Sequence, residues 1–195
     1  MLERLLVKIH VGECMTILET IFAGLLFLSP AYADTKDDAR LQKELDAQCL
    51  ALNMYHEARG QGSAGLLGVS SVVLNRVADK RFPNNICEVI EQGPTRESWK
   101  TKQTPDPTDA VFYPIRHRCQ FSWFCDGRSD VPKDTKTYKR LLTIASSIVY
   151  NKFDFVDITD GALFYHADYV TPSWAKTKIK TVEIQDHIFY RWEVK

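Results

Sequence analysis

The segment NMYHEARGQGSAG, residues 53–65, contains side chains that could support three kinds of chemistry. His56 and Glu57 are the first two residues of a zinc-binding motif, and residues 60–65 have the glycine spacing of a dinucleotide-binding loop. Glu57 could also act alone as a general acid. Each chemistry requires its own local structure, so the neighbouring sequence decides among them.

The dinucleotide interpretation fails because its glycines must follow a strand and open a helix, where the backbone can approach a pyrophosphate. Here the glycines follow a helical pattern. A corner between two helices needs glycine for its own backbone geometry. We therefore expect no nucleotide cofactor.

The zinc interpretation fails on spacing. The motif His-Glu-x-x-His places two imidazoles one helical turn apart, and Gly60 stands where the second histidine belongs. A scattered site is the remaining metal hypothesis, although isolated histidines are more often structural; its candidates are His56, His117, His166 and His187. We expect neither a metal nor a cofactor.

The general-acid interpretation fits the context best. Cleavage of a glycosidic bond needs a carboxylic acid that stays protonated near neutral pH. Glu57 lies at the end of a helical pattern, where burial and the negative end of the helix dipole both favour the protonated form. An ion pair between Glu57 and Arg59 is the purely structural interpretation of the same residue.

The elements around this segment predict an α+β domain, with helices first and strands later. Apolar periodicity predicts helices over residues 37–58, 64–81, 85–93 and 136–151, with Ser63 capping the second. A long proline-containing segment, residues 93–136, is typical of a functional or stapled loop, and residues 118–127 within it are predicted as a strand or hairpin. Strands are predicted over residues 161–167, 180–185 and 187–194.

The first 33 residues have the pattern of an export signal. Basic residues precede a short apolar run, residues 21–28, and Ala31-Tyr32-Ala33 forms a small-x-small cleavage site. The run is too short for a membrane span. We predict cleavage after Ala33, one catalytic domain over residues 34–195, and a periplasmic or secreted location; an uncleaved anchor and a start at Met15 stay open.

Charge and cysteine content narrow the class of protein further. The chain has 25 basic and 25 acidic residues, which argues against a dedicated nucleic-acid binder. Four cysteines follow the signal, an even number that suits disulfides in an oxidising compartment. We favour Cys119–Cys125 and Cys49–Cys87, while different pairings, a reactive thiol or a zinc site remain open.

Several motifs in a fixed order resemble those of the SleB-like cell-wall hydrolases, the spore-cortex-lytic-enzyme family. They are Glu57-Ala58-Arg59-Gly60-Gln61, Leu74-Asn75-Arg76-Val77, Phe82-Pro83, Gln120-Phe121-Ser122, Tyr165-His166, Trp174, and an aromatic segment with His187, Phe189 and Tyr190. The resemblance spans about residues 50–192 and implies a lysozyme-like domain that acts on peptidoglycan. The cysteines are not part of the family pattern.

The resemblance implies that Glu57 is the catalytic acid. It also implies a lytic transglycosylase, in which one glutamate acts first as acid and then as base. If the enzyme hydrolyses instead, Asp126, Asp157 and Asp160 are candidates for a second carboxylate. An amidase that cuts the stem peptide and a non-catalytic wall-binding protein are the competing hypotheses.

The remaining matched residues are candidate substrate-binding or bracing side chains: Gln120, Phe121, Ser122, Tyr165, His166, Trp174 and His187. Asn75 and Arg76 are interpreted as structural, tying the second helix to the active-site loop. We expect a monomer that binds peptidoglycan glycan strands through its cleft, with no separate wall-binding module and no membrane span after signal removal.

Overall fold

The computed structural model describes residues 17–103, 106–151 and 154–192, and for residues 17–35 it describes the backbone alone. The chain divides into two compact units, one up to Leu41 and one from Gln42 onward. The first contains the beginning of helix α1, which runs from Ile17 to Ala58. The second contains every predicted site residue.

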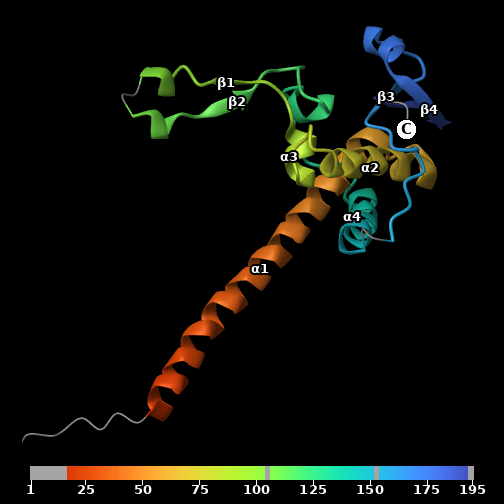
Figure 1. Ribbon diagram of the computed structural model, residues 1–195. Coiled ribbons are helices and arrows are strands. Elements are labelled where there is room, and N and C mark those ends of the chain that lie inside the picture. Colours follow the sequence, from red (N-terminus) through yellow and green to blue (C-terminus); the bar gives the residue numbers. More distant parts are fainter. Residues whose placement is uncertain (1–16, 104–105, 152–153, 193–195) are drawn as a thin grey trace, which may run out of the picture. The chain divides into compact units, whose positions relative to one another are not determined.

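The second unit consists of helices followed by a small antiparallel sheet near the C-terminus, so the predicted α+β class is confirmed (Figure 1). Its further α-helices are α2 (Gly62–Ala78), α3 (Ile86–Glu91) and α4 (Thr135–Tyr150). Its strands are β1 (Thr95–Glu97), β2 (Phe112–Pro114), β3 (Phe164–Ala167), β4 (Ile179–Ile184) and β5 (His187–Arg191). Four short 3-10 helices complete it: η1 (Thr101–Gln103), η2 (Pro107–Asp109), η3 (Ser122–Cys125) and η4 (Ser173–Thr177).

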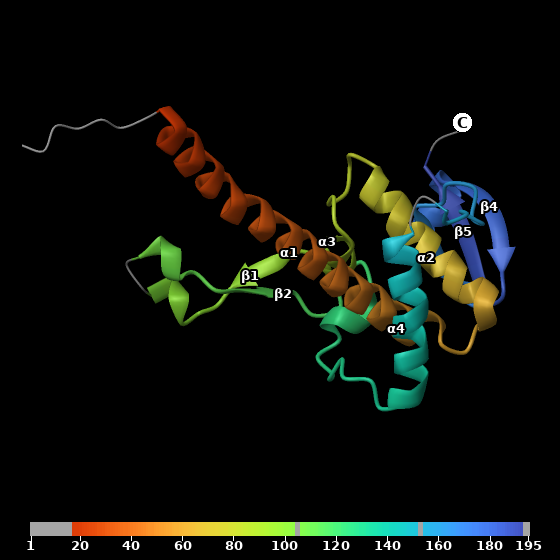
Figure 2. The same ribbon diagram turned by 90° about the horizontal axis from the view of Figure 1, so that it is seen from below.

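Helix α2 is buried on two sides, and Figure 2 shows it between α4 and the strands β4 and β5. Val69 and Val73 belong to a core cluster with the C-terminal part of α1, α3 and α4. Val72 packs with Phe189 of β5 in a second cluster. Burial on both sides explains how a helix rich in β-branched residues is stabilised despite its modest helix propensity.

A glycine sets the distance between α2 and the sheet. A Cβ atom added at Gly68 would lie only 2.8 Å from Cζ of the fully buried Phe189. The sheet has the order β3-β5-β4, and β3 pairs with β5 so that Tyr165 lies opposite Phe189. Gly68 therefore allows β5 to pack directly on α2 and fixes where β3 lies.

The structure corrects two local predictions. Residues 118–127 are neither a strand nor a hairpin, because residues 122–125 form the 3-10 helix η3 within a loop closed by a disulfide. Ser63 is not the N-cap of α2: Gln61 occupies that position, and Gly62 begins the helix with a φ of +63°. A positive φ is readily adopted by glycine and explains the residue at this corner.

Both predicted disulfides are present, Cys49–Cys87 between α1 and α3 and Cys119–Cys125 across η3. Residues 1–16 of the predicted signal lie outside the described residues, and residues 17–33 are helical backbone. Export and cleavage therefore stay predictions. Within the described part of the chain, no helix combines the length and apolar character that a membrane span requires.

Candidate active site

Glu57 lies in the last turn of α1, one residue before the helix ends. The corner that follows is attached to the sheet through Gln61. Its side-chain N–H donates to Asp186 Oδ2 at 2.7 Å, and its carbonyl oxygen accepts from the Asp186 backbone N–H at 3.1 Å. Because Asp186 lies in the turn between β4 and β5, this pair of hydrogen bonds holds the Glu57 corner against the sheet.

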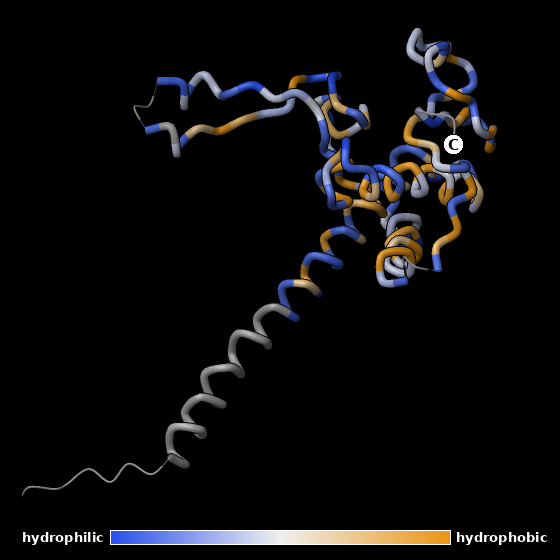
Figure 3. Tube along the Cα trace, in the orientation of Figure 1, coloured by the Kyte–Doolittle hydropathy of each residue, from blue (hydrophilic) through white to orange (hydrophobic). Residues whose placement is uncertain are grey.

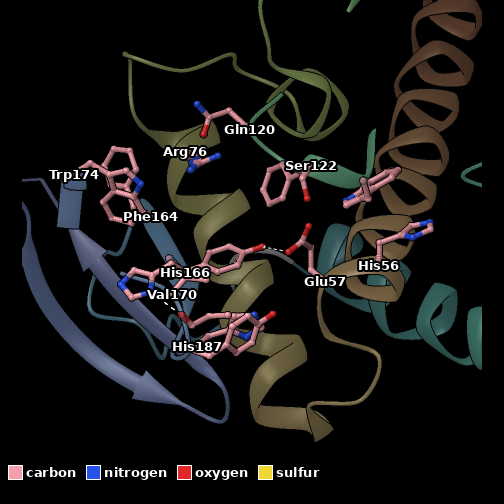
Figure 4. Close-up of a pocket in the computed structure, with 15 residues that line it drawn as sticks. His56, Glu57, Arg76, Gln120, Ser122, Phe164, His166, Val170, Trp174 and His187 are labelled. Atoms are coloured by element: carbon pink, nitrogen blue, oxygen red, sulfur yellow. Dashed lines mark hydrogen bonds between the residues drawn. The ribbon is translucent and has the colours of Figure 1, made fainter. Parts of the chain in front are cut away.

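Glu57 faces a pocket of about 490 Å³ (Figure 4). The walls come from the end of α1, from α2, from the disulfide loop around η3, from β3 and the segment after it, and from β5. The lining residues are His56, Glu57, Arg76, Gln120, Phe121, Ser122, Trp123, Phe164, Tyr165, His166, Ala167, Tyr169, Val170, Trp174 and His187. Among these residues of the described chain, Glu57 is the sole carboxylic acid.

Tyr165 is the direct partner of Glu57. Its hydroxyl donates to Glu57 Oε2 at 3.0 Å, as the dashed line in Figure 4 marks. Burial raises the pKa of the Glu57 carboxyl, and the hydrogen bond from Tyr165 opposes part of that rise. A carboxyl whose pKa is raised by burial keeps its proton to a higher pH than a free glutamate does, which suits a general acid.

The Tyr165 hydroxyl is held as a donor. Burial, and then the nearby Glu57 carboxylate, raise the pKa of Tyr165 well above its ordinary value. The ring makes an edge contact with His187 at 5.0 Å and a tilted contact with Phe189 at 5.6 Å. Pairing of β3 with β5 and packing on these rings fix the orientation of the hydroxyl toward Glu57.

Arg76 forms another part of the wall and is only 4% exposed. Its Nε–H donates to the Leu163 carbonyl at 2.8 Å, and its guanidinium carbon lies 5.4 Å from the centre of the Phe121 ring and 5.7 Å from that of Phe164. Burial lowers the pKa of Arg76 to about 10, so it remains cationic at neutral pH. Its Nη1 has no hydrogen-bond partner within the described part of the chain.

Asn75 and Arg76 both connect α2 to the segment that leads into β3, in agreement with their predicted structural role. The Asn75 side-chain N–H donates to the Ala162 carbonyl at 3.0 Å and to Asp157 Oδ2 at 3.1 Å. The sequence did not indicate that Arg76 also lines the pocket. Because Arg76 belongs to the same motif as Asn75, the sequence indicated a structural role for it and not contact with a ligand.

The structure brings all seven predicted substrate-binding residues to the same pocket as Glu57. Gln120 and Ser122 are exposed, whereas Phe121 is only 3% exposed and also packs in the main core. Phe121 therefore separates the pocket from the core, and Gln120 and Ser122 present polar groups to the opening.

The two predicted histidines differ in their contacts. His166 Nε2 lies 3.0 Å from the Tyr190 hydroxyl, and its Nδ1 lies 2.8 Å from the Ala167 carbonyl. His187 is buried, and desolvation lowers its pKa, which favours the neutral imidazole. Trp174 packs on His166 at 5.6 Å and on Tyr190 at 5.5 Å, so these rings brace one another beside the pocket.

His56 and Trp123 line the pocket although they were absent from the predicted substrate-binding set. Their rings stack at 4.6 Å, and the Trp123 indole N–H donates to Asn53 Oδ1 at 3.1 Å. One signal was present in the sequence, since His56 directly precedes Glu57 and Trp123 directly follows the Gln120-Phe121-Ser122 motif.

The candidate second carboxylates lie elsewhere. Asp157 accepts hydrogen bonds from Thr159 and Gly161 in the loop before β3, and Asp160 forms an ion pair with Arg191. Asp126 lines a neighbouring cavity of about 230 Å³. Among the described residues, no three His, Cys, Asp or Glu side chains gather in a way that could hold a metal ion.

The sequence of residues 60–190 matches the family model described as cell wall hydrolase, so the chain belongs to the cell wall hydrolase family. This confirms the resemblance drawn from the motifs. Glu57 lies three residues before the matched segment, so the family match does not include it.

Relatives of this chain include spore cortex-lytic enzymes. The enzyme of Bacillus cereus is 28% identical over 146 residues, which cover 74% of this chain and 43% of the relative. The enzyme of Halalkalibacterium halodurans is 26% identical over 145 residues, which cover 74% of this chain and 34% of the relative. This chain therefore spans less than half the length of these relatives. The solved catalytic domain of the germination-specific lytic transglycosylase SleB from Bacillus anthracis is 27% identical, with 75% of this chain and 93% of that chain covered and a TM-score of 0.48.

Proposed function

We propose that the protein cleaves the glycan strand of peptidoglycan between N-acetylmuramic acid and N-acetylglucosamine as a lytic transglycosylase, with Glu57 as general acid and base. The observation that carries the proposal is a partly buried carboxyl, with a pKa raised by burial, that is the sole acid among the described residues lining its pocket. Membership in the cell wall hydrolase family and the similarity to spore cortex-lytic enzymes support a cell-wall substrate.

One carboxyl group suffices for this reaction. Protonated Glu57 gives its proton to the glycosidic oxygen, the bond from that oxygen to C1 of the muramoyl residue breaks, and the electron pair leaves with the oxygen. The Glu57 carboxylate then takes the proton of the muramoyl C6 hydroxyl while O6 bonds to C1. The products are a 1,6-anhydro-muramoyl end and a free hydroxyl, no water is consumed, and Glu57 ends protonated.

Other pocket groups are suited to position the strand. The Tyr165 hydroxyl holds one oxygen of Glu57 and so orients the other toward the substrate. Exposed amide and hydroxyl groups at Gln120 and Ser122 can bind acetamide and sugar hydroxyl groups, and aromatic rings offer surfaces for the apolar faces of sugars. We further propose that export through the N-terminal signal delivers the enzyme to the periplasm or the exterior.

The identity of the product ends tests the proposal. Purified peptidoglycan is digested in water enriched in ¹⁸O, and the fragments are separated and weighed by mass spectrometry. A lytic transglycosylase yields anhydro ends without ¹⁸O, one water lighter than hydrolytic products. Reducing ends that carry ¹⁸O would instead establish a muramidase, and free stem peptides would establish an amidase. Absence of cleavage would indicate a non-catalytic wall-binding protein. Each of these three results would contradict the proposal.

A further inference from the structure

A second cavity lies on the hairpin formed by β1 and β2, apart from the pocket of Glu57. The two strands pair antiparallel, and the ladder continues beyond them, since the Ser98 N–H donates to the Val111 carbonyl at 2.7 Å. Figure 1 shows the hairpin extending away from α2 and α4, and Figure 3 shows an apolar stretch along β2 on this extension. The sequence predicted only a long loop in this region.

This cavity combines aromatic rings with positive charges. Arg96 of β1 lies directly opposite Tyr113 of β2, which places both on the same face. Together with Trp99 and two lysines they line a cavity of about 540 Å³. Trp99 is 69% exposed and Tyr113 is 56% exposed, so both large rings are open to a ligand.

The cations of this cavity outnumber its acids among the described residues. Its cations are Arg96, Lys100 and Lys102, and none of them forms an ion pair with a described residue. Its one acid, Glu97, accepts a hydrogen bond from the Thr101 hydroxyl at 3.3 Å. The Lys100 ammonium lies 5.9 Å from the centre of the Trp99 ring, so a positive charge stands beside an exposed aromatic surface.

We propose that this cavity is an accessory binding site for peptidoglycan, in which Trp99 and Tyr113 pack on sugar or peptide and the cations bind carboxylates of the stem peptides. The proposal rests on the proposed function, since it concerns the same substrate. Peptidoglycan offers apolar sugar faces and free carboxylates on one polymer, and the cavity offers the complement of both. A second contact on one polymer raises the apparent affinity of the first by effective concentration.

Lipid is a poorer fit for this surface. A segment that inserts into a membrane interface presents apolar residues at its end. Here the described residues near the tip include Asp106 and Asp109, whose carboxylates anionic headgroups would repel.

Co-sedimentation with purified insoluble peptidoglycan tests the site. The variant Trp99→Ala/Tyr113→Ala is compared with Phe112→Ala, which removes a similarly exposed ring (58%) of the same hairpin that does not line the cavity. We expect the double variant to bind about tenfold more weakly and the control to bind like the parent protein. A charge reversal, Lys100→Glu/Lys102→Glu, should also weaken binding, and its effect should shrink at high salt. Unfolding temperatures establish that each variant is folded.

Two further comparisons separate this site from a lipid-binding surface and from the catalytic pocket. Peptidoglycan whose stem-peptide carboxylates have been converted to amides stays insoluble and should bind the parent protein and the charge-reversed variant alike. Short peptide-free glycans should be cleaved at the same rate by both. Equal sedimentation of all variants would overturn the proposal, as would binding to anionic vesicles that depends on Trp99 while peptidoglycan binding does not. If the parent protein cleaves no glycan but its co-sedimentation with peptidoglycan depends on Trp99 and Tyr113, the proposed catalytic function is wrong and the accessory site is supported.

Discussion

The hydrogen bond between Tyr165 and Glu57 leads to a specific kinetic prediction for Tyr165→Phe. This substitution removes the hydroxyl that donates to Glu57 Oε2 at 3.0 Å and leaves the buried ring in place. The bond favours the carboxylate over the protonated acid, and burial acts in the opposite direction. With the bond removed, burial acts unopposed and the pKa of Glu57 rises further.

The size of the effect follows from the energy of the bond. A hydrogen bond to a charged group contributes about 1.5–3 kcal/mol, and we use the lower end because Glu57 faces an open pocket. About 1.4 kcal/mol corresponds to a tenfold change in an equilibrium constant, so the ionisation of Glu57 shifts about tenfold toward the protonated acid. Loss of orientation also lowers the maximal rate, roughly ten- to a hundredfold.

The assay is the pH dependence of anhydro-product formation from a soluble glycan. Activity falls at high pH as the acid loses its proton, and in Tyr165→Phe this alkaline limb should move to higher pH. Tyr55→Phe is the matched control, because Tyr55 is also buried and its hydroxyl instead accepts from the Asp134 N–H at 3.1 Å. Its alkaline limb should stay in place.

An unchanged alkaline limb in Tyr165→Phe, with the rate merely reduced, would refute this reasoning. It would mean that the hydroxyl positions the substrate or braces the fold and does not tune the acid. A limb that moves to lower pH would contradict the assigned direction of the hydrogen bond's effect.

Two further predictions concern stability. The folded-state pKa of Glu57 is raised, so its contribution to stability is full below the unfolded value of about 4.5 and is lost as pH rises through the folded pKa. Glu57→Gln should therefore raise the unfolding temperature by an amount that grows as pH rises through this range. A difference that does not change with pH would contradict the assigned pKa shift. Replacing Cys49 and Cys87 by serine should destabilise by about 4 kcal/mol, and replacing Cys119 and Cys125 by about 2 kcal/mol, because the closed loops differ in length. At a temperature where both variants are folded, activity should fall more in the Cys119/Cys125 variant, because its loop carries Gln120, Phe121 and Ser122 of the pocket. Denaturant unfolding measures the two losses of stability, and product assays measure the two losses of activity.

Much of the fold could be predicted because its signals are local. Apolar periodicity located α2 and α4, and alternating aromatic and β-branched residues located β3 and β5. The β1–β2 hairpin was missed, since its strands have three residues each and lie within the proline-containing segment, residues 93–136. The 3-10 helix η3 was missed because a short disulfide loop, not the propensity of its aromatic residues, determines its backbone.

Site residues that belong to sequence motifs could be predicted, whereas site features that depend on tertiary contacts could not. Family motifs pointed to Glu57 and to Tyr165, but nothing local indicates that a hydroxyl 108 positions away donates to that carboxyl. Arg76 lies in a motif interpreted as structural, and its exposure to the pocket depends on how α2 packs against β3. The exposed rings of the hairpin were likewise invisible, because the sequence does not show which face each strand residue occupies.

The most direct test of the central claim is the rate at which Glu57→Gln forms anhydro-muramoyl ends, measured beside Glu91→Gln. Glu91 is a matched control because burial also raises its carboxyl pKa, and it does not line the Glu57 pocket. We predict that Glu57→Gln loses anhydro-product formation while remaining folded, and that Glu91→Gln retains the parent rate. Undiminished product formation by Glu57→Gln would contradict the assignment of Glu57 as the proton donor.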